Sequence, residues 1–121
     1  MRTGAIAGVG VLFCAMGVFA IAAPAALARP FDITVETPTS RSEIRAVYGG
    51  FGIAVAAILW WAASGNTDMH AGIVIGVGVS LAGMAFGRLL SRLFDTATSF
   101  YPIWFYFCVE ALGAGLLITI A

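Results

Sequence analysis

Four long apolar runs, joined by short polar segments, most strongly constrain what this chain can fold into. Each run is about 20 residues or longer, the length that a helix needs to cross a hydrocarbon core of roughly 30 Å. Inside lipid the backbone must satisfy its own hydrogen bonds, which helices and closed barrels do. Unbroken runs favour helices, because barrel strands alternate apolar and polar residues over about ten positions. The sequence therefore predicts one all-α integral membrane domain over residues 1–121, a four-transmembrane-helix antiparallel bundle.

We expect the spans at about residues 4–28, 44–63, 69–89 and 101–121. The first run has a second interpretation, because Arg2, the apolar stretch and Ala26-Leu27-Ala28 before Arg29 together resemble a secretory signal peptide with its cleavage site. The run is longer than a usual signal core, so we interpret it as a retained span. Pro24 should kink its last turns, because proline lacks a backbone donor.

Local signals place the helix ends. Ser40 and Glu43 fit a capping box that starts the second helix before the membrane, so Glu43 is expected to act as a capping residue. That helix should end near the aromatic pair Trp60-Trp61, which is typical of a membrane interface. Asp68 is the expected N-cap of the third helix.

Charge is sparse and balanced. Of the residues, 61% are hydrophobic and 10% charged, and six arginines balance six acidic residues, with no lysine. This composition gives no support to a nucleic-acid partner and makes the lipid bilayer the first partner. The loops after the first and third spans hold five of the six arginines: Arg29, Arg41, Arg45, Arg88 and Arg92. The positive-inside rule then predicts that these two loops are cytoplasmic and both termini outside, in a bacterial cytoplasmic membrane.

Small residues form stripes on two of the expected helices. On the third helix the stripe comprises Gly72, Gly76, Ser80, Gly83, Gly87 and Ser91, and on the second helix Gly49, Gly52, Ala56 and Ala63 share a side with Arg45. Such GxxxG-like stripes let helix backbones approach closely in lipid. Our first interpretation is that they pack the bundle, with the third helix at its centre. The second is that they receive a partner subunit or a second copy of the chain.

Glu110 is the most informative single residue, because a carboxylate inside the membrane costs roughly 2.5–3.5 kcal/mol or more unless it is paired or protonated. We expect it to point into the bundle, either as a proton-handling or ligand-binding group or as a polar tie between helices. Arg45, Tyr48, Arg88 and Glu110 form a candidate polar pocket. Direct contact between Arg88 and Glu110 is marginal, since ideal helices place them about 10 Å apart in height. Alternatively, Arg45 and Arg88 reach the lipid headgroups.

No catalytic constellation emerges from the remaining residues. The sequence offers no nucleophile–base pair and no phosphate-binding glycine loop, and we expect no cofactor and no metal. His70 stands alone and is interpreted as an interfacial side chain. Cys14 and Cys108 lie in apolar runs, where cysteine packs as a small hydrophobe.

Several motifs together carry a family resemblance: Arg45-Ala-Val-Tyr48-Gly49-Gly50 at the second span, Gly87-Arg88 ending the third, Asp95 in the next loop and Glu110 inside the fourth. In this order they resemble an uncharacterised family of small bacterial four-helix membrane proteins, a domain of unknown function. More remotely the layout is similar to DoxX-type proteins. The resemblance implies a bacterial cytoplasmic membrane location and four spans, and it implies no activity.

Two functions follow as hypotheses. The first is a non-catalytic accessory or structural subunit that packs against other membrane proteins through its small-residue faces. The second is a binder or carrier of a small molecule, lipid or quinone, which would use the polar pocket around Arg45, Tyr48, Arg88 and Glu110.

Overall fold

The chain folds into four long helical segments in a computed structural model that describes residues 2–121. The first is α1 (Arg2–Ala22), followed by the short α2 (Pro24–Ala28) and η1 (Arg29–Phe31). The second joins α3 (Pro38–Ile44), η2 (Arg45–Gly50) and α4 (Phe51–Ala63). The third is α5 (His70–Phe94), and the fourth joins η3 (Phe100–Trp104) to α6 (Phe105–Ile120). All four are long and apolar enough to span a membrane, which confirms the predicted all-α class.

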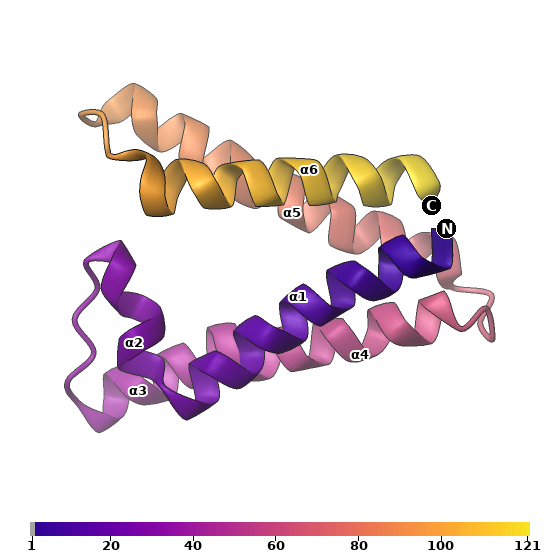
Figure 1. Cartoon of the computed structure of the whole chain (residues 1–121), viewed down its shortest axis with the longest axis horizontal. Helices are drawn as coiled ribbons and strands as arrows, with labels where there is room; N and C mark the ends of the chain where they lie inside the picture. The colour runs from indigo at the N-terminus through magenta and orange to yellow at the C-terminus, as the bar shows by residue number, and fades with distance from the viewer. Residues whose placement is uncertain (1) are drawn as a thin grey trace.

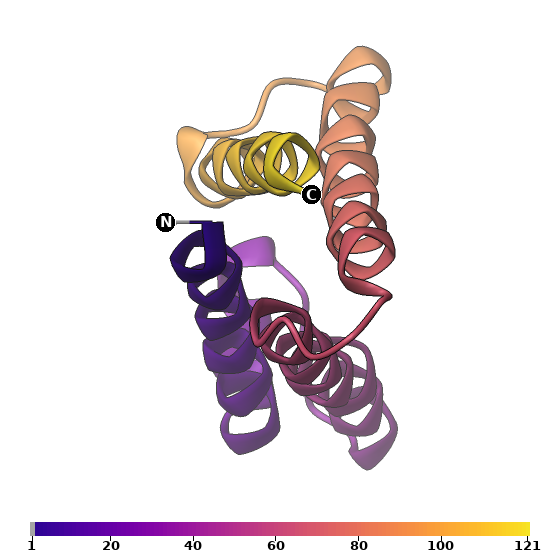
Figure 2. The same ribbon diagram turned by 90° about the vertical axis from the view of Figure 1, so that its right-hand side faces the viewer.

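The helices are arranged as two pairs. Helix α1 packs along α4, and α5 packs along α6, whereas contacts between the pairs are fewer. Figure 1 shows the pairs close together at the end that holds both termini and farther apart at the end that holds α2 and α3, and Figure 2 shows the same division end-on. The loops after the first and third spans share one end, as expected of an up-down-up-down chain.

One side chain from each helix meets in the core that joins the two pairs. Ile6, Leu59, Val74 and Leu117 are the largest fully buried side chains among residues 2–121, and they come from α1, α4, α5 and α6 in turn. All four lie toward the end with the termini, where Arg2 also donates a hydrogen bond to the carbonyl of Ile120. The four-helix contact is therefore concentrated at one end of the bundle.

Small residues bring α1 and the second span close together. A Cβ added to Gly17 would lie 2.7 Å from the carbonyl oxygen of Gly49, and one added to Gly52 would lie 2.9 Å from that of Phe13. Toward the other end, the indole of Trp60 covers Gly10 and donates from Nε1 to the carbonyl of Ala7 over 3.1 Å. The second-helix stripe thus packs inside the bundle.

The small-residue stripe on α5 does not pack inside the bundle. A Cβ added to Gly72, Gly76, Gly83 or Gly87 would meet no atom of another helix in the described chain within 4 Å. Helix α5 instead buries its other face, which includes Val74, Gly78 and Leu81. The prediction that this stripe packs the bundle with the third helix at its centre is wrong, because the buried and glycine-rich faces lie on opposite sides of the helix.

Two predicted helix starts also need correction. The second span begins at Pro38 and is capped by Thr37, whose Oγ1 accepts from the amide of Ser40 over 3.1 Å while the Ser40 hydroxyl accepts from the amide of Thr37. Threonine followed by proline at the first helical position is the stronger start signal. Glu43 therefore lies inside the helix and caps nothing. Helix α5 begins at His70, and Asp68 is not its cap.

Candidate functional site

A paired arginine and glutamate link α5 to α6. Arg88 donates from Nε to Oε1 of Glu110 over 2.7 Å and from Nη2 to Oε2 over 2.9 Å, the two-pronged geometry that suits a guanidinium and a carboxylate. The Glu110 side chain is 5% exposed and that of Arg88 21%. The expectation that Glu110 points into the bundle is confirmed, with an arginine as its partner.

Ideal helices make direct contact between Arg88 and Glu110 marginal, yet the structure shows it, and the reason is where the two helices end. Helix α5 continues to Phe94, so Arg88 lies about 9 Å inside its end at 1.5 Å per residue. The regular helix α6 starts only at Phe105, after the irregular η3, so Glu110 lies about 8 Å inside its own end. In antiparallel neighbours these two depths coincide.

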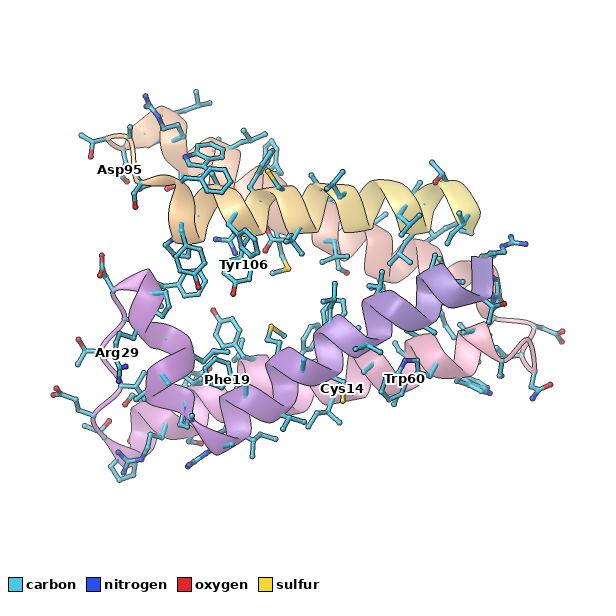
Figure 3. All side chains as sticks on the ribbon, in the orientation of Figure 1. Cys14, Phe19, Arg29, Trp60, Asp95 and Tyr106 are labelled. Atoms are coloured by element: carbon cyan, nitrogen blue, oxygen red, sulfur yellow. The ribbon has the colours of Figure 1, made fainter. Side chains whose placement is uncertain are left out.

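Aromatic rings from both helix pairs lie against the guanidinium of Arg88. The guanidinium carbon of Arg88 lies 5.8 Å from the ring centre of Phe31 in η1 and 5.9 Å from that of Tyr106 in α6. The rings of Phe31 and Tyr106 are 5.4 Å apart, and Figure 3 shows Tyr106 extending from α6 toward the α1–α2 side. Cation–π contacts of this kind retain the arginine charge in an apolar setting. Phe31 had no signal in the sequence, because it lies in a short polar loop.

Arg45 and Tyr48 take up other positions. Arg45 donates from Nε to the carbonyl of Ile21 over 3.0 Å, at the point where Pro24 ends α1 and leaves carbonyls without helical partners. Tyr48 is half-buried and packs on the small apolar cluster of Ala20, Ala28, Val35 and Ile44. Both belong to η2, whose turns are wider than those of an α-helix, a feature that recurs at functional positions in helices. The structure thus joins only two of the four predicted pocket residues by hydrogen bonds.

A pocket of about 520 Å³ opens beside Arg88, on α5 and the chain that follows it. Its walls include Arg88 and Arg92, one helical turn apart, together with Asp95, Thr98 and Trp104. In the sequence, Arg92 served only to predict the orientation of the chain in the membrane. The spacing of four residues between Arg88 and Arg92 was the available signal, because it places both on one side of a helix.

The arrangement suits binding and positioning of charge. The buried carboxylate of Glu110 holds two N–H donors of Arg88 in place. The Arg88–Glu110 ion pair is therefore a fixed neutral unit. Arg92 is exposed, and its one hydrogen bond is a 3.4 Å contact from Nη1 to the backbone carbonyl of Asp95. The pocket therefore presents one cation already neutralised and one open to a ligand.

Comparisons with known proteins identify a family. A family model described as "Domain of unknown function (DUF4345)" matches residues 1–121, which is the whole chain. No curated protein and no solved structure matches the chain significantly. The family match confirms the resemblance to an uncharacterised family, and the more remote likeness to DoxX-type proteins stays a prediction.

Proposed function

We propose that this chain, which belongs to the family of the domain of unknown function DUF4345, is a non-catalytic accessory or structural subunit of other membrane proteins. Its four long apolar helices indicate a multi-pass membrane protein. The observation that carries the docking role is the exposed face of α5, where Gly72, Gly76, Gly83 and Gly87 contact no other helix of the described chain. A face of this shape suits the close approach of another transmembrane helix.

The energetics of glycine support this role. A glycine inside a helix costs about 1 kcal/mol relative to alanine. At Gly17 on α1 and Gly52 on α4, close packing between the first and second spans offsets that cost within the chain. Within residues 2–121 no such packing offsets the cost on the outer face of α5. A helix from a partner subunit, or from a second copy of the chain, would supply the missing contact.

Bulky substitutions on this face test the proposal. Gly76→Leu and Gly83→Leu should abolish co-purification of the partner, or self-association, from native membranes solubilised in mild detergent. Gly115→Leu is the matched control, because Gly115 on α6 also has open space around it. The proposal fails if the native protein is a monomer with no co-purifying protein, or if all three variants behave alike.

We also propose a location and an orientation: a bacterial cytoplasmic membrane, with the loops after the first and third spans in the cytoplasm and both termini outside. Support comes from the arginines: five of the six lie in η1, α3, η2 and the last two turns of α5, whereas Arg2 begins α1 at the other end of the bundle. Alkaline phosphatase fused to the C-terminus should be active, whereas the same enzyme inserted in the loop at residues 95–99 should be inactive. The reverse result would overturn the orientation.

The second candidate function is binding or carriage of a small molecule, lipid or quinone, and the pocket beside Arg88 favours it. In this case Glu110→Gln should abolish binding, because it releases Arg88 from its fixed position, while the bundle stays assembled. Equal loss of assembly and of binding would favour the structural role.

A further inference from the structure

We propose that the pocket between the last turns of α5 and η3 binds a phospholipid whose headgroup joins a phosphate to a primary ammonium. This inference goes beyond the docking role, because it concerns a different class of ligand, although Gly87 of the docking face also lines the pocket. It rests on the second candidate function, whose ligand it specifies. It rests on two opposite charges, those of Arg92 and Asp95, which line the same pocket.

Arg92 provides the site for the phosphate. Among residues 2–121 the one ion pair joins Arg88 to Glu110, so no carboxylate neutralises Arg92. Its single hydrogen bond, to the carbonyl of Asp95, is long at 3.4 Å and leaves most guanidinium donors free. A free guanidinium binds two phosphate oxygens at once, and Thr96 and Thr98, which also line the pocket, carry hydroxyls that are able to donate.

Asp95 provides the site for the ammonium. Its carboxylate has no cation partner within the described residues, although Arg92 lies only three residues away. Opposite charges that line one pocket without pairing with each other fit a zwitterion better than an anion, since a purely anionic headgroup would leave Asp95 facing like charge. A primary ammonium also donates N–H groups to a carboxylate, which a trimethylated ammonium cannot do.

The apolar walls identify the ligand as a lipid. Met84, Ile103 and Trp104 line the same pocket, and Met84 is exposed. Tryptophan is enriched where headgroups meet acyl chains. The charged walls lie at the end of α5 and in the loop that Figure 3 marks with Asp95, so the acyl chains would leave past Met84 along the membrane-facing side.

Native mass spectrometry of the full-length protein tests the selectivity. The protein in detergent is titrated separately with short-chain phosphatidylethanolamine, phosphatidylcholine and phosphatidylglycerol, and bound lipid is quantified. Phosphatidylethanolamine should bind about tenfold more tightly than either of the others, the ratio expected of one additional charge-assisted contact. Equal binding of the three lipids, or tighter binding of phosphatidylglycerol, would overturn the proposal.

Two variants assign the halves of the site. Asp95→Asn should remove the preference for phosphatidylethanolamine and raise binding of phosphatidylglycerol, whereas Arg92→Gln should weaken binding of all three lipids about tenfold. Arg41→Gln and Asp68→Asn are matched controls, because neither residue lines the pocket. Unchanged helicity by circular dichroism shows that the variants fold. Variants that match their controls would contradict the proposal. Displacement of the lipid by equimolar O-phosphoethanolamine would also contradict it, because that result would assign the site to a soluble ligand.

Discussion

Arg88 on α5 donates two hydrogen bonds, of 2.7 and 2.9 Å, to the carboxylate of Glu110 on α6, and together they form a neutral unit inside a largely apolar helix pair. Either charge alone would cost several kcal/mol in the membrane. As a pair they fix the register of α5 against α6, because the two side chains meet at one depth. The same arginine lines the pocket at the end of α5, so the pair also holds one wall of that pocket in place.

Removing only the Glu110 carboxylate should destabilise the contact between α5 and α6 more than replacing both members of the ion pair. Glu110→Gln leaves the Arg88 charge without its partner and should lower the free energy of unfolding by on the order of 3 kcal/mol. The double replacement Arg88→Met with Glu110→Leu should recover most of that loss, because two apolar groups need no partner. Unfolding in mixed detergent micelles, followed by circular dichroism, measures both. Glu43→Gln is the control on an exposed charge, and equal stability of Glu110→Gln and this control would contradict the assignment.

Phe31 should hold the loop segment α2–η1 against the other helix pair. Its ring contacts Tyr106 and lies 5.8 Å from Arg88, and contacts between the two pairs are otherwise sparse at this end. Phe31→Ala removes both contacts, worth about 1 kcal/mol. Hydrogen exchange of residues 24–31 should then become several-fold faster. Phe31→Trp, which retains an aromatic face, should preserve protection, and Ile33→Ala is the control for an exposed neighbour. Unchanged exchange in Phe31→Ala would rule out this role.

The number of helices could be predicted from the sequence, but which face of each helix packs inside the bundle could not. Lengths of apolar runs are set by the membrane thickness, so four spans follow directly. Which side of α5 packs inside the chain does not follow, because lipid and protein interior are equally apolar. Val74, Val77 and Leu81 on one side and the glycine stripe on the other are both compatible with burial. Only the contacts that α5 makes with the other helices decide between them.

The candidate site was predictable in part for a similar reason. A carboxylate in an apolar run must be buried with a partner, so Glu110 was identified from the sequence. Its partner depends on the relative heights of two helices, and η3 changes that height because Tyr101 has an extended backbone (φ −95°, ψ 134°) where a regular helix was expected. Arg45 was predicted to line the same polar pocket, but it lies elsewhere. It binds a carbonyl freed by the break at Pro24, a role that depends on where the chain turns back.

Trp60 and Trp61 form a matched pair for testing the contact between α1 and α4. They are similarly exposed, at 41% and 44%, yet Trp60 alone donates a hydrogen bond across the helices, to the carbonyl of Ala7. Trp60→Phe should therefore lower the free energy of unfolding by about 1 kcal/mol. Trp61→Phe should change it little. Equal effects of the two substitutions in micelle unfolding would show that the hydrogen bond contributes nothing.

Glycines on the inner and outer faces should respond in opposite ways to the same substitution. Gly17→Ala places a Cβ 2.7 Å from the carbonyl oxygen of Gly49, so α1 and α4 must separate, at a cost of about 1–3 kcal/mol. Gly76→Ala meets no atom of another helix within 4 Å in the described chain. It should leave the monomer unchanged or up to about 1 kcal/mol more stable, through the higher helix propensity of alanine. Thermal unfolding of the detergent-solubilised monomer measures both effects. A Gly76→Ala protein as unstable as Gly17→Ala would mean that the outer face of α5 packs inside the chain, and the docking surface would be lost.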